Sequence, residues 1–136
     1  MNESNTAVIQ NLYSAFNQGD INAVLAIVDP AGEWVNYGPP SVPYFGDFTG
    51  RLTDFFDAIG QSTTNGNVAV HRYMEAGENV ITEARWTATV KATGLRIDAP
   101  IVHVFTLRAG KVTSWRGYAD TAAVAAAHTG NKAAAA

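Results

Sequence analysis

Apolar residues recur at helical spacing in three places in the first half of the chain. The first set is Ile9, Leu12, Tyr13 and Phe16. The second set is Ile21, Val24, Leu25 and Val28, and the third is Leu52, Phe55, Phe56 and Ile59. Each follows the i, i+3, i+4, i+7 pattern that places four side chains on one face of an α-helix. We therefore expect three amphipathic helices, of which the first two form a helical hairpin.

The residues around the first two helices suit helix ends. Asn5 can cap the start of the first helix, and Gly19 suits the left-handed position that follows its end. Asp20 can cap the second helix. Asp29-Pro30 should stop that helix, because the residue before a proline avoids helical angles. The turn between the two helices is accordingly very short.

Most of the second half alternates between apolar and polar residues with a period of two, which predicts β-strands. The predicted strands are Glu33–Tyr37, before the third helix, and then Asn67–Ala76, Val80–Lys91, Arg96–Leu107 and Lys111–Tyr118. The strand Arg96–Leu107 is apolar on both faces, so we expect it to be central and covered on both sides. After the last strand, Asp120 should cap a short alanine-rich helix that ends near His128.

This order of elements predicts an α+β fold. We expect a cone-shaped roll, in which a strongly curved antiparallel or mixed sheet wraps around three N-terminal helices and a short C-terminal helix follows. The 136 residues suit one domain, which we place at 1–130, with a frayed tail at 131–136. A cone of this kind leaves a pocket at its mouth.

The segment Gly38–Gly50 carries three prolines and three aromatic residues. A loop of this length and composition is seldom a plain linker. Two interpretations are open: the rings pin the loop to the core, or the loop forms a lid over the pocket.

The composition excludes several classes of protein. Charged residues make up only 15% of the chain, and nine basic against twelve acidic residues give a net charge of −3, which argues against a nucleic-acid partner. The lack of cysteine excludes disulfides and thiolate metal sites. No apolar run nears the length of a membrane span and no secretory signal is evident, so we expect a cytoplasmic domain. The fourteen aromatic residues either fill the core or line a pocket or a subunit interface.

The familiar catalytic motifs are absent, including the nucleophile elbow, the phosphate loop and paired metal-binding histidines. The three histidines, His71, His103 and His128, lie far apart in the sequence. We therefore expect neither a metal nor another cofactor.

His103 is the most informative single residue, because it lies in the middle of the central strand. Burial there should keep its ring neutral. It is either a core histidine satisfied by a backbone or tyrosine partner, or an acid, base or hydrogen-bond donor in the pocket. Asn36 can orient a carbonyl or a water, or it can bond the turn at Gly38. Asp120 caps the last helix and could also present its carboxylate to a ligand.

These residues resemble a known family. The helical hairpin ending at Gly19-Asp20, the strand Glu33–Tyr37, the helix start at Gly50-Arg51 and the stretch from Gly110 to Asp120 are similar to the SnoaL-like branch of the nuclear transport factor 2-like superfamily. That branch includes polyketide cyclases, ketosteroid isomerase and limonene epoxide hydrolase. The resemblance covers about residues 5 to 128 and implies the cone-shaped fold, which hosts many chemistries.

The catalytic residues of the named relatives carry over poorly. The epoxide hydrolase holds its water with a tyrosine and an asparagine at positions that resemble Trp34 and Asn36. Its Asp-Arg-Asp group corresponds to Gly117, Ala84 and Trp86, so that mechanism is not expected, although its pocket tryptophan is kept as Trp115.

Ketosteroid isomerase has its aspartate base at the place of Asn36 and its oxyanion-hole aspartate at the place of His103. The tyrosine donor of that isomerase lies near Leu12 or Tyr13. The isomerase base is therefore absent here as well.

We expect an apolar pocket that binds a small cyclic or polyketide-like carbonyl compound and catalyses acid–base chemistry on it: isomerisation, cyclisation or hydration. The candidate catalytic residues are His103 as base or proton shuttle, Asn36 and Asp120. The candidate substrate-binding residues are Trp34, Trp86, Trp115, Tyr13, Phe45, Ile101 and Phe55. The alternative is a non-catalytic binding module for an apolar small molecule. No membrane partner is expected.

The outer face of the sheet predicts a homodimer. Its apolar residues are Val102, Val104, Val112 and Tyr118. A face of this kind is too apolar to remain in contact with water, and members of the resembled family commonly pair through it.

Overall fold

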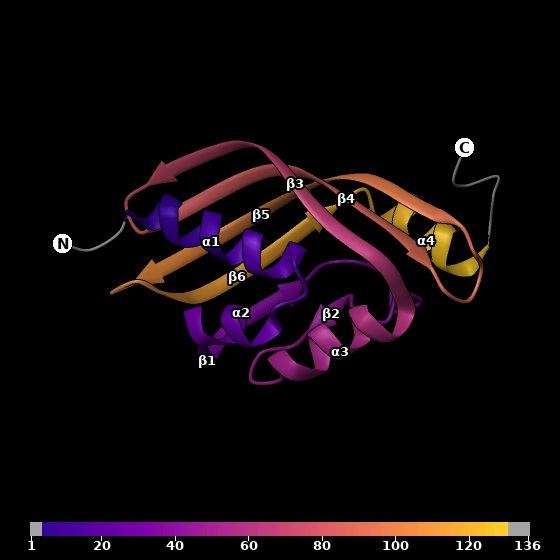
Figure 1. The fold of residues 1–136 in the computed structure, drawn as a ribbon, viewed down its shortest axis with the longest axis horizontal. Helices are drawn as coiled ribbons and strands as arrows, with labels where there is room; N and C mark the ends of the chain where they lie inside the picture. Colours follow the sequence, from indigo (N-terminus) through magenta and orange to yellow (C-terminus); the bar gives the residue numbers. More distant parts are fainter. Residues whose placement is uncertain (1–3, 131–136) are drawn as a thin grey trace.

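A computed structural model describes residues 4–130 of the chain, and within this range it contains four helices and six strands (Figure 1). The helices are α1 (Asn5–Asn17), α2 (Ile21–Ile27), α3 (Leu52–Ser62) and α4 (Thr121–Thr129). The strands are β1 (Val28–Asn36), β2 (Gly46–Asp47), β3 (Thr63–Ala76), β4 (Asn79–Val90), β5 (Arg96–Arg108) and β6 (Lys111–Ala119). None of the helices in this range has the length and apolar character needed to cross a membrane.

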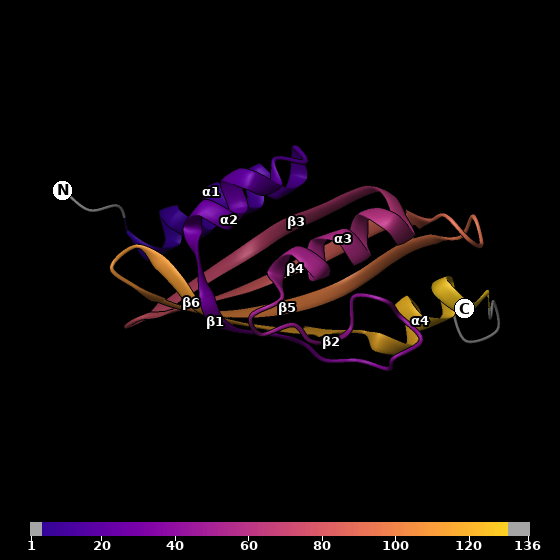
Figure 2. The same ribbon diagram turned by 90° about the horizontal axis from the view of Figure 1, so that it is seen from below.

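All six strands form one sheet in the order β2-β1-β6-β5-β4-β3. Neighbouring strands are antiparallel except β1 and β6, which are parallel, so the sheet is mixed. The helices α1, α2 and α3 lie on one side of the curved sheet, and α4 lies near one end (Figure 2). The predicted α+β roll, with β5 inside the sheet, is therefore confirmed.

The helical hairpin forms as predicted except at its first residue. The N-cap of α1 is Ser4 rather than Asn5, because the Ser4 side chain accepts a hydrogen bond from the backbone N–H of Ala7, while Asn5 already lies in the helix. Gly19 has a φ of +77°, as its place after the helix end requires. The Asp20 side chain accepts from the backbone N–H of Ala23 and caps α2 as predicted.

Val28 does not belong to the second helix, contrary to its place in the apolar stripe. Its backbone is extended, and it pairs with Val112 at the start of β1. The strand therefore begins five residues before Glu33, and the register shifts between Val28 and Glu33. Because Asp29 precedes a proline, the chain must already be extended there, and a β-branched valine completes the strand more easily than a helical turn.

The segment between β1 and α3 packs on the core through its rings, which is one of the two arrangements its sequence left open. Val42, Tyr44, Phe45 and Phe48 are all buried. Strand β2 pairs with β1, and the backbone N–H of Phe48 donates to the carbonyl of Trp34. The aromatic rings of this segment are therefore part of the wall of the interior and do not form a separate lid.

The outer face of the sheet differs from the prediction at Val112, which is 0% exposed and lies in the core. A register shift between Thr106 and Leu107 pairs Leu107 with Val112, which turns Val112 inward. Val102 and Val104 are only half-buried in a single chain. The expectation that β5 is covered on both sides is therefore wrong for one chain.

Candidate functional site

An apolar cavity of about 80 Å³ lies between the helices and the inner face of the sheet. Helices α1 and α3, five strands and the segment before α3 all contribute to its wall. Nine of the predicted site residues line it: Tyr13, Trp34, Asn36, Phe45, Phe55, Trp86, Ile101, His103 and Trp115. Asp120 does not line it. The structure therefore gathers residues that are far apart in the sequence around one space; Tyr13 and His103, for example, are ninety positions apart.

Stacked aromatic rings form one wall of the cavity. The indoles of Trp34 and Trp115 stack with their centroids 4.7 Å apart, because β1 and β6 pair them directly. Phe55 of α3 packs against both, at 5.8 Å and 5.3 Å. Nε1 of Trp34 is enclosed and has no hydrogen-bond partner within the described residues. This wall is apolar except for that one unpaired donor.

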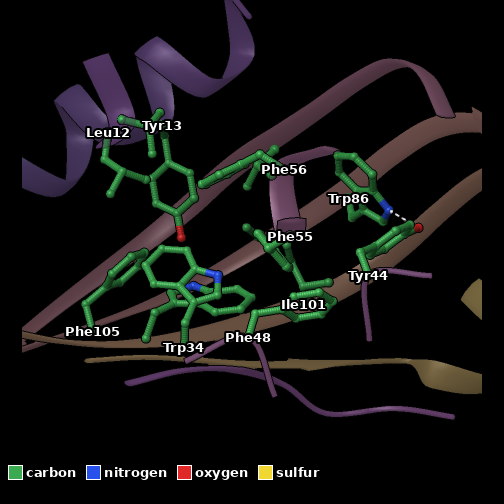
Figure 3. Close-up of a cluster of buried hydrophobic side chains, with 14 of the residues drawn as sticks. Leu12, Tyr13, Trp34, Tyr44, Phe48, Phe55, Phe56, Trp86, Ile101 and Phe105 are labelled. Carbon is green, nitrogen blue, oxygen red and sulfur yellow. Dashed lines mark hydrogen bonds between the residues drawn. The ribbon is translucent and has the colours of Figure 1, made fainter. Parts of the chain in front are cut away.

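His103 is held by a buried tyrosine. The Tyr13 hydroxyl lies 2.7 Å from Nδ1 of His103 and also 2.7 Å from Oγ1 of Thr82. Tyr13 points from α1 toward the sheet, above the rings of Trp34 and Phe105 (Figure 3). The contact arises because β4 and β5 place Thr82 and His103 side by side on the inner face.

The His103 ring is neutral. Burial among aromatic rings lowers the pKa of His103 from its ordinary 6.5 to about 3. Its Nε2 makes no hydrogen bond with a described residue. In the described part of the chain, the fully enclosed side-chain atoms without a hydrogen bond are Trp34 Nε1 and Arg116 Nε, and Nε2 of His103 is not among them. Nε2 therefore remains accessible from the cavity that His103 lines.

Asn36 is the second polar group at the cavity. Its Nδ2 donates to the backbone carbonyl of Tyr44 at 3.0 Å, which fixes the orientation of the amide and leaves Oδ1 without a hydrogen-bond donor among the described residues. Oδ1 lies over Gly117, where a Cβ atom would come within 2.4 Å of it. The missing side chain at position 117 therefore makes room for Asn36.

Asp120 acts as the predicted helix cap, because its side chain accepts from the backbone N–H of Ala123 at 3.2 Å at the start of α4. It is exposed and lies outside the residues that line the cavity. The predicted contact of its carboxylate with a ligand stays a prediction without support from the geometry.

Besides several apolar residues of the wall, two hydrogen-bonding residues at the site, Thr82 and Tyr44, were missed by the sequence interpretation. Thr82 is 0% exposed and bonds Tyr13. The alternation of Val80, Ala84 and Trp86 places it on their face, so the strand period could have indicated it. Tyr44 accepts a hydrogen bond from Nε1 of Trp86 at 3.1 Å (Figure 3). No spacing rule inside an irregular segment could have indicated Tyr44.

Tyr44 also joins the site to α4. Its hydroxyl lies 2.8 Å from Nε2 of His128, whose pKa is lowered by burial, and burial raises the pKa of Tyr44 to about 12. Because Nε1 of Trp86 donates to the phenol oxygen, the phenol proton is free to go to Nε2 of His128 in the tautomer in which Nε2 carries no proton. This bond links the segment before α3 to the C-terminal helix.

Among the described residues 4–130, no Asp, Glu, Lys or Arg side chain lines the cavity, and the histidine that lines it, His103, is neutral. The ion pairs of the described residues lie on exposed surface, and three of them join strand residues: Arg72–Glu83, Arg85–Asp98 and Arg116–Glu33. Within residues 4–130 no three side chains of the metal-ligating types come together. The chemistry available inside the cavity is therefore hydrogen bonding by neutral groups.

Comparison with known proteins shows the family of the chain. The family model of the SnoaL-like domain matches residues 9–115, so the chain belongs to the SnoaL-like domain family. No curated protein matches the sequence significantly.

Solved structures of similar proteins share the fold. An NTF2-like protein from Burkholderia thailandensis has a TM-score of 0.83 at 24% identity, covering 93% of this chain and 98% of that one. TerC, co-crystallised with polyporic acid, has a TM-score of 0.82 at 23% identity, covering 92% and 98%. A protein with a ketosteroid isomerase-like fold from Catenulispora acidiphila, in complex with trimethylamine, has a TM-score of 0.69 at 18% identity, covering 82% and 83%. The resemblance inferred from the sequence is confirmed.

The neutral state of His103 makes stability depend on pH. The unfolded chain protonates this residue near pH 6.5 and the folded chain only near pH 3. The stability that the neutral ring contributes is therefore complete above pH 6.5 and is lost as the pH falls from 6.5 toward 3. We expect the free energy of unfolding to fall by up to about 1.4 kcal/mol per pH unit from this residue. Urea unfolding at a series of pH values should show a shallower dependence for His103→Asn than for the wild type. Equal slopes would contradict the prediction.

Gly117→Ala should destabilise the fold by about 1–3 kcal/mol through overpacking. The new Cβ would meet Asn36 Oδ1 at 2.4 Å and the Trp115 ring at 2.7 Å. Gly60→Ala in α3 is a matched control, because nothing lies within 4 Å of its Cβ position and alanine favours the helix. Chemical denaturation measures both variants. A Gly117→Ala variant as stable as Gly60→Ala would show that Asn36 and Trp115 are not confined as described.

Proposed function

We propose that this chain binds a small, mostly apolar carbonyl compound in the cavity and catalyses acid–base chemistry on it, in the class of isomerisation, cyclisation or hydration. His103 makes the polar contact with the reacting carbonyl group, and Asn36 orients the compound or a water beside it. The walls hold the apolar part of the compound.

One observation carries this proposal. The cavity is apolar, and the partly accessible polar atoms on its wall that lack a protein partner include one nitrogen of a neutral imidazole, Nε2 of His103, and one amide oxygen, Oδ1 of Asn36. Few, convergent polar groups in an apolar pocket are typical of sites that orient a small molecule. Neutral hydrogen-bonding groups act strongly where water is excluded.

The related structures support binding of small organic molecules by this fold. TerC was crystallised with polyporic acid, and the Catenulispora protein was solved with trimethylamine. Because this fold carries many different activities, these ligands support the type of site and do not identify the compound.

A second candidate function is a non-catalytic binding module for an apolar small molecule. The observation that favours it is that the cavity wall formed by the described part of the chain carries no Asp, Glu, Lys or Arg side chain. An enzyme of this class commonly uses a carboxylate or another base of matched pKa. Binding without conversion would distinguish this module from the enzyme.

We also propose that two copies of the chain pair through the outer face of the sheet. Tyr37 and Tyr118 are each 45% exposed, and their rings lie 5.1 Å apart at the end of β1 and in β6. Val102 and Val104 extend this apolar surface onto β5, and Arg116 with Glu33 forms an ion pair beside it. An apolar centre with charges around it resembles a subunit interface.

His103→Ala should lower turnover by ~10²-fold or more, because the variant removes the polar contact at the carbonyl group. Ligand affinity should fall by no more than about tenfold, the value of one lost hydrogen bond, since the aromatic walls remain. A panel of ketones, quinones and lactones is screened by quenching of tryptophan fluorescence and then by mass analysis of products. His71→Ala is the control, because His71 is an exposed residue of β3. Unchanged turnover in His103→Ala would refute the catalytic role, and binding without any conversion by the wild type would support the module instead.

Sedimentation at micromolar concentration should show a species of twice the mass of one chain. Val104→Lys places a charge on the outer face and should shift this species toward the single chain. Gln61→Lys adds the same charge at an exposed position of α3 and should leave the mass unchanged. A wild type that sediments only as a single chain would rule the dimer out.

A further inference from the structure

We infer that the buried hydrogen-bond chain from Thr82 through Tyr13 fixes the proton of His103 on Nε2, so that the cavity offers a hydrogen-bond donor and selects ligands that present an acceptor oxygen. Thr82 and Tyr13 are positioning residues in this scheme, because they act through His103. The selection of ligands rests on the proposed function, whereas the position of the proton does not.

The direction of the hydrogen bonds from Thr82 through Tyr13 to His103 follows from counting protons. Thr82, Tyr13 and neutral His103 carry one exchangeable proton each, and two contacts of 2.7 Å join them. Oγ1 of Thr82 has the Tyr13 hydroxyl as its partner, and the side chain is 0% exposed. If the Thr82 proton did not go to Tyr13, it would be left unpaired in the core, which is costly.

The remaining assignments then have one solution. With its oxygen accepting from Thr82, the Tyr13 hydroxyl donates to Nδ1 of His103, so Nδ1 carries no proton and Nε2 does. In the reverse direction, Nδ1 would donate to Tyr13, Tyr13 to Thr82, and the Thr82 proton would have no acceptor. Burial raises the pKa of Tyr13 and lowers the pKa of His103, so both groups stay neutral and the count holds over a broad pH range.

This assignment decides what His103 can do. The lone pair of Nδ1 is occupied by Tyr13, and Nε2 carries a proton, so neither nitrogen can accept a proton from a ligand. The role left for His103 is to donate a hydrogen bond from Nε2 and polarise a carbonyl group. The role of general base, which the sequence suggested for this residue, is therefore disfavoured. The donor is strengthened because successive hydrogen bonds polarise one another.

The buried hydrogen-bond chain, with its proton on Nε2 of His103, also predicts the class of ligand. A buried N–H that meets no acceptor loses hydrogen bonding with water, so an analogue that lacks the oxygen should bind less well. Cyclohexanone and methylenecyclohexane have nearly the same shape, but only the ketone offers an acceptor oxygen. We expect the wild type to bind the ketone about tenfold more tightly, which fluorescence quenching of the cavity tryptophans can measure.

Nitrogen-15 NMR of the full chain with labelled histidines tests the proton position directly. The His103 signals are assigned by their loss in His103→Ala, and at pH 7 we expect a protonated Nε2 and an unprotonated, hydrogen-bonded Nδ1. Tyr13→Phe removes the donor to Nδ1 and should produce a mixture of the two tautomers and lower the tenfold ketone preference. Thr82→Val controls for the loss of a polar group from this cluster: the Tyr13 proton then has Nδ1 as its only acceptor among the described residues, so the Nε2–H form should persist.

The outcomes separate this inference from the proposed function. A proton on Nδ1 in the wild type, or an unchanged single tautomer in Tyr13→Phe, would overturn the inference even if His103→Ala abolished turnover. A proton on Nε2 supports it even if the chain proves to be a binding module. Equal affinity for cyclohexanone and methylenecyclohexane would overturn the selection of acceptor ligands.

Discussion

The burial of one imidazole among aromatic rings is the constraint on which the interior of this protein depends. His103 sits between Trp115, Phe105 and Tyr13, with ring centroids 4.9 Å, 6.0 Å and 5.9 Å away. In such surroundings the ring stays neutral and needs a hydrogen-bond partner, which Tyr13 supplies across the layer between α1 and the sheet. The same bond joins α1 to the centre of the sheet, so one hydrogen bond both orients His103 in the site and helps to fix the packing of α1.

On the other side of the cavity, the space left by Gly117 fits the hydrogen-bonded amide of Asn36. Gly117 leaves room for the amide of Asn36, and the amide in turn holds the segment before α3 through the carbonyl of Tyr44. A charged side chain at position 117 would collide with the Asn36 amide and remove this fit. The fold is shared with an NTF2-like protein and with a protein of ketosteroid isomerase-like fold, and in this chain the polar groups on the cavity wall are neutral hydrogen-bonding groups.

Local patterns predicted most elements and most residues of the cavity, because helical and strand periods decide which face of an element is apolar. The errors occur where two local signals compete. Val28 fits the helical stripe, yet the proline two positions later and pairing with Val112 place it in a strand. Ser4 and Asn5 are adjacent and both suit an N-cap, so residue type alone does not show which of them caps α1. Val112 faces inward because a bulge changes the alternation, and no local pattern reveals that bulge.

By itself, the sequence determined the α+β order of elements and the apolar faces, because these follow from residue type and spacing. Only the tertiary structure decided the partners of the buried polar groups. Thr82 and His103 face each other because β4 and β5 pair in one register, and Tyr13 reaches them because α1 crosses that point of the sheet. Register and helix placement depend on contacts far apart in the chain, so the direction of a proton in this core is a property of the fold.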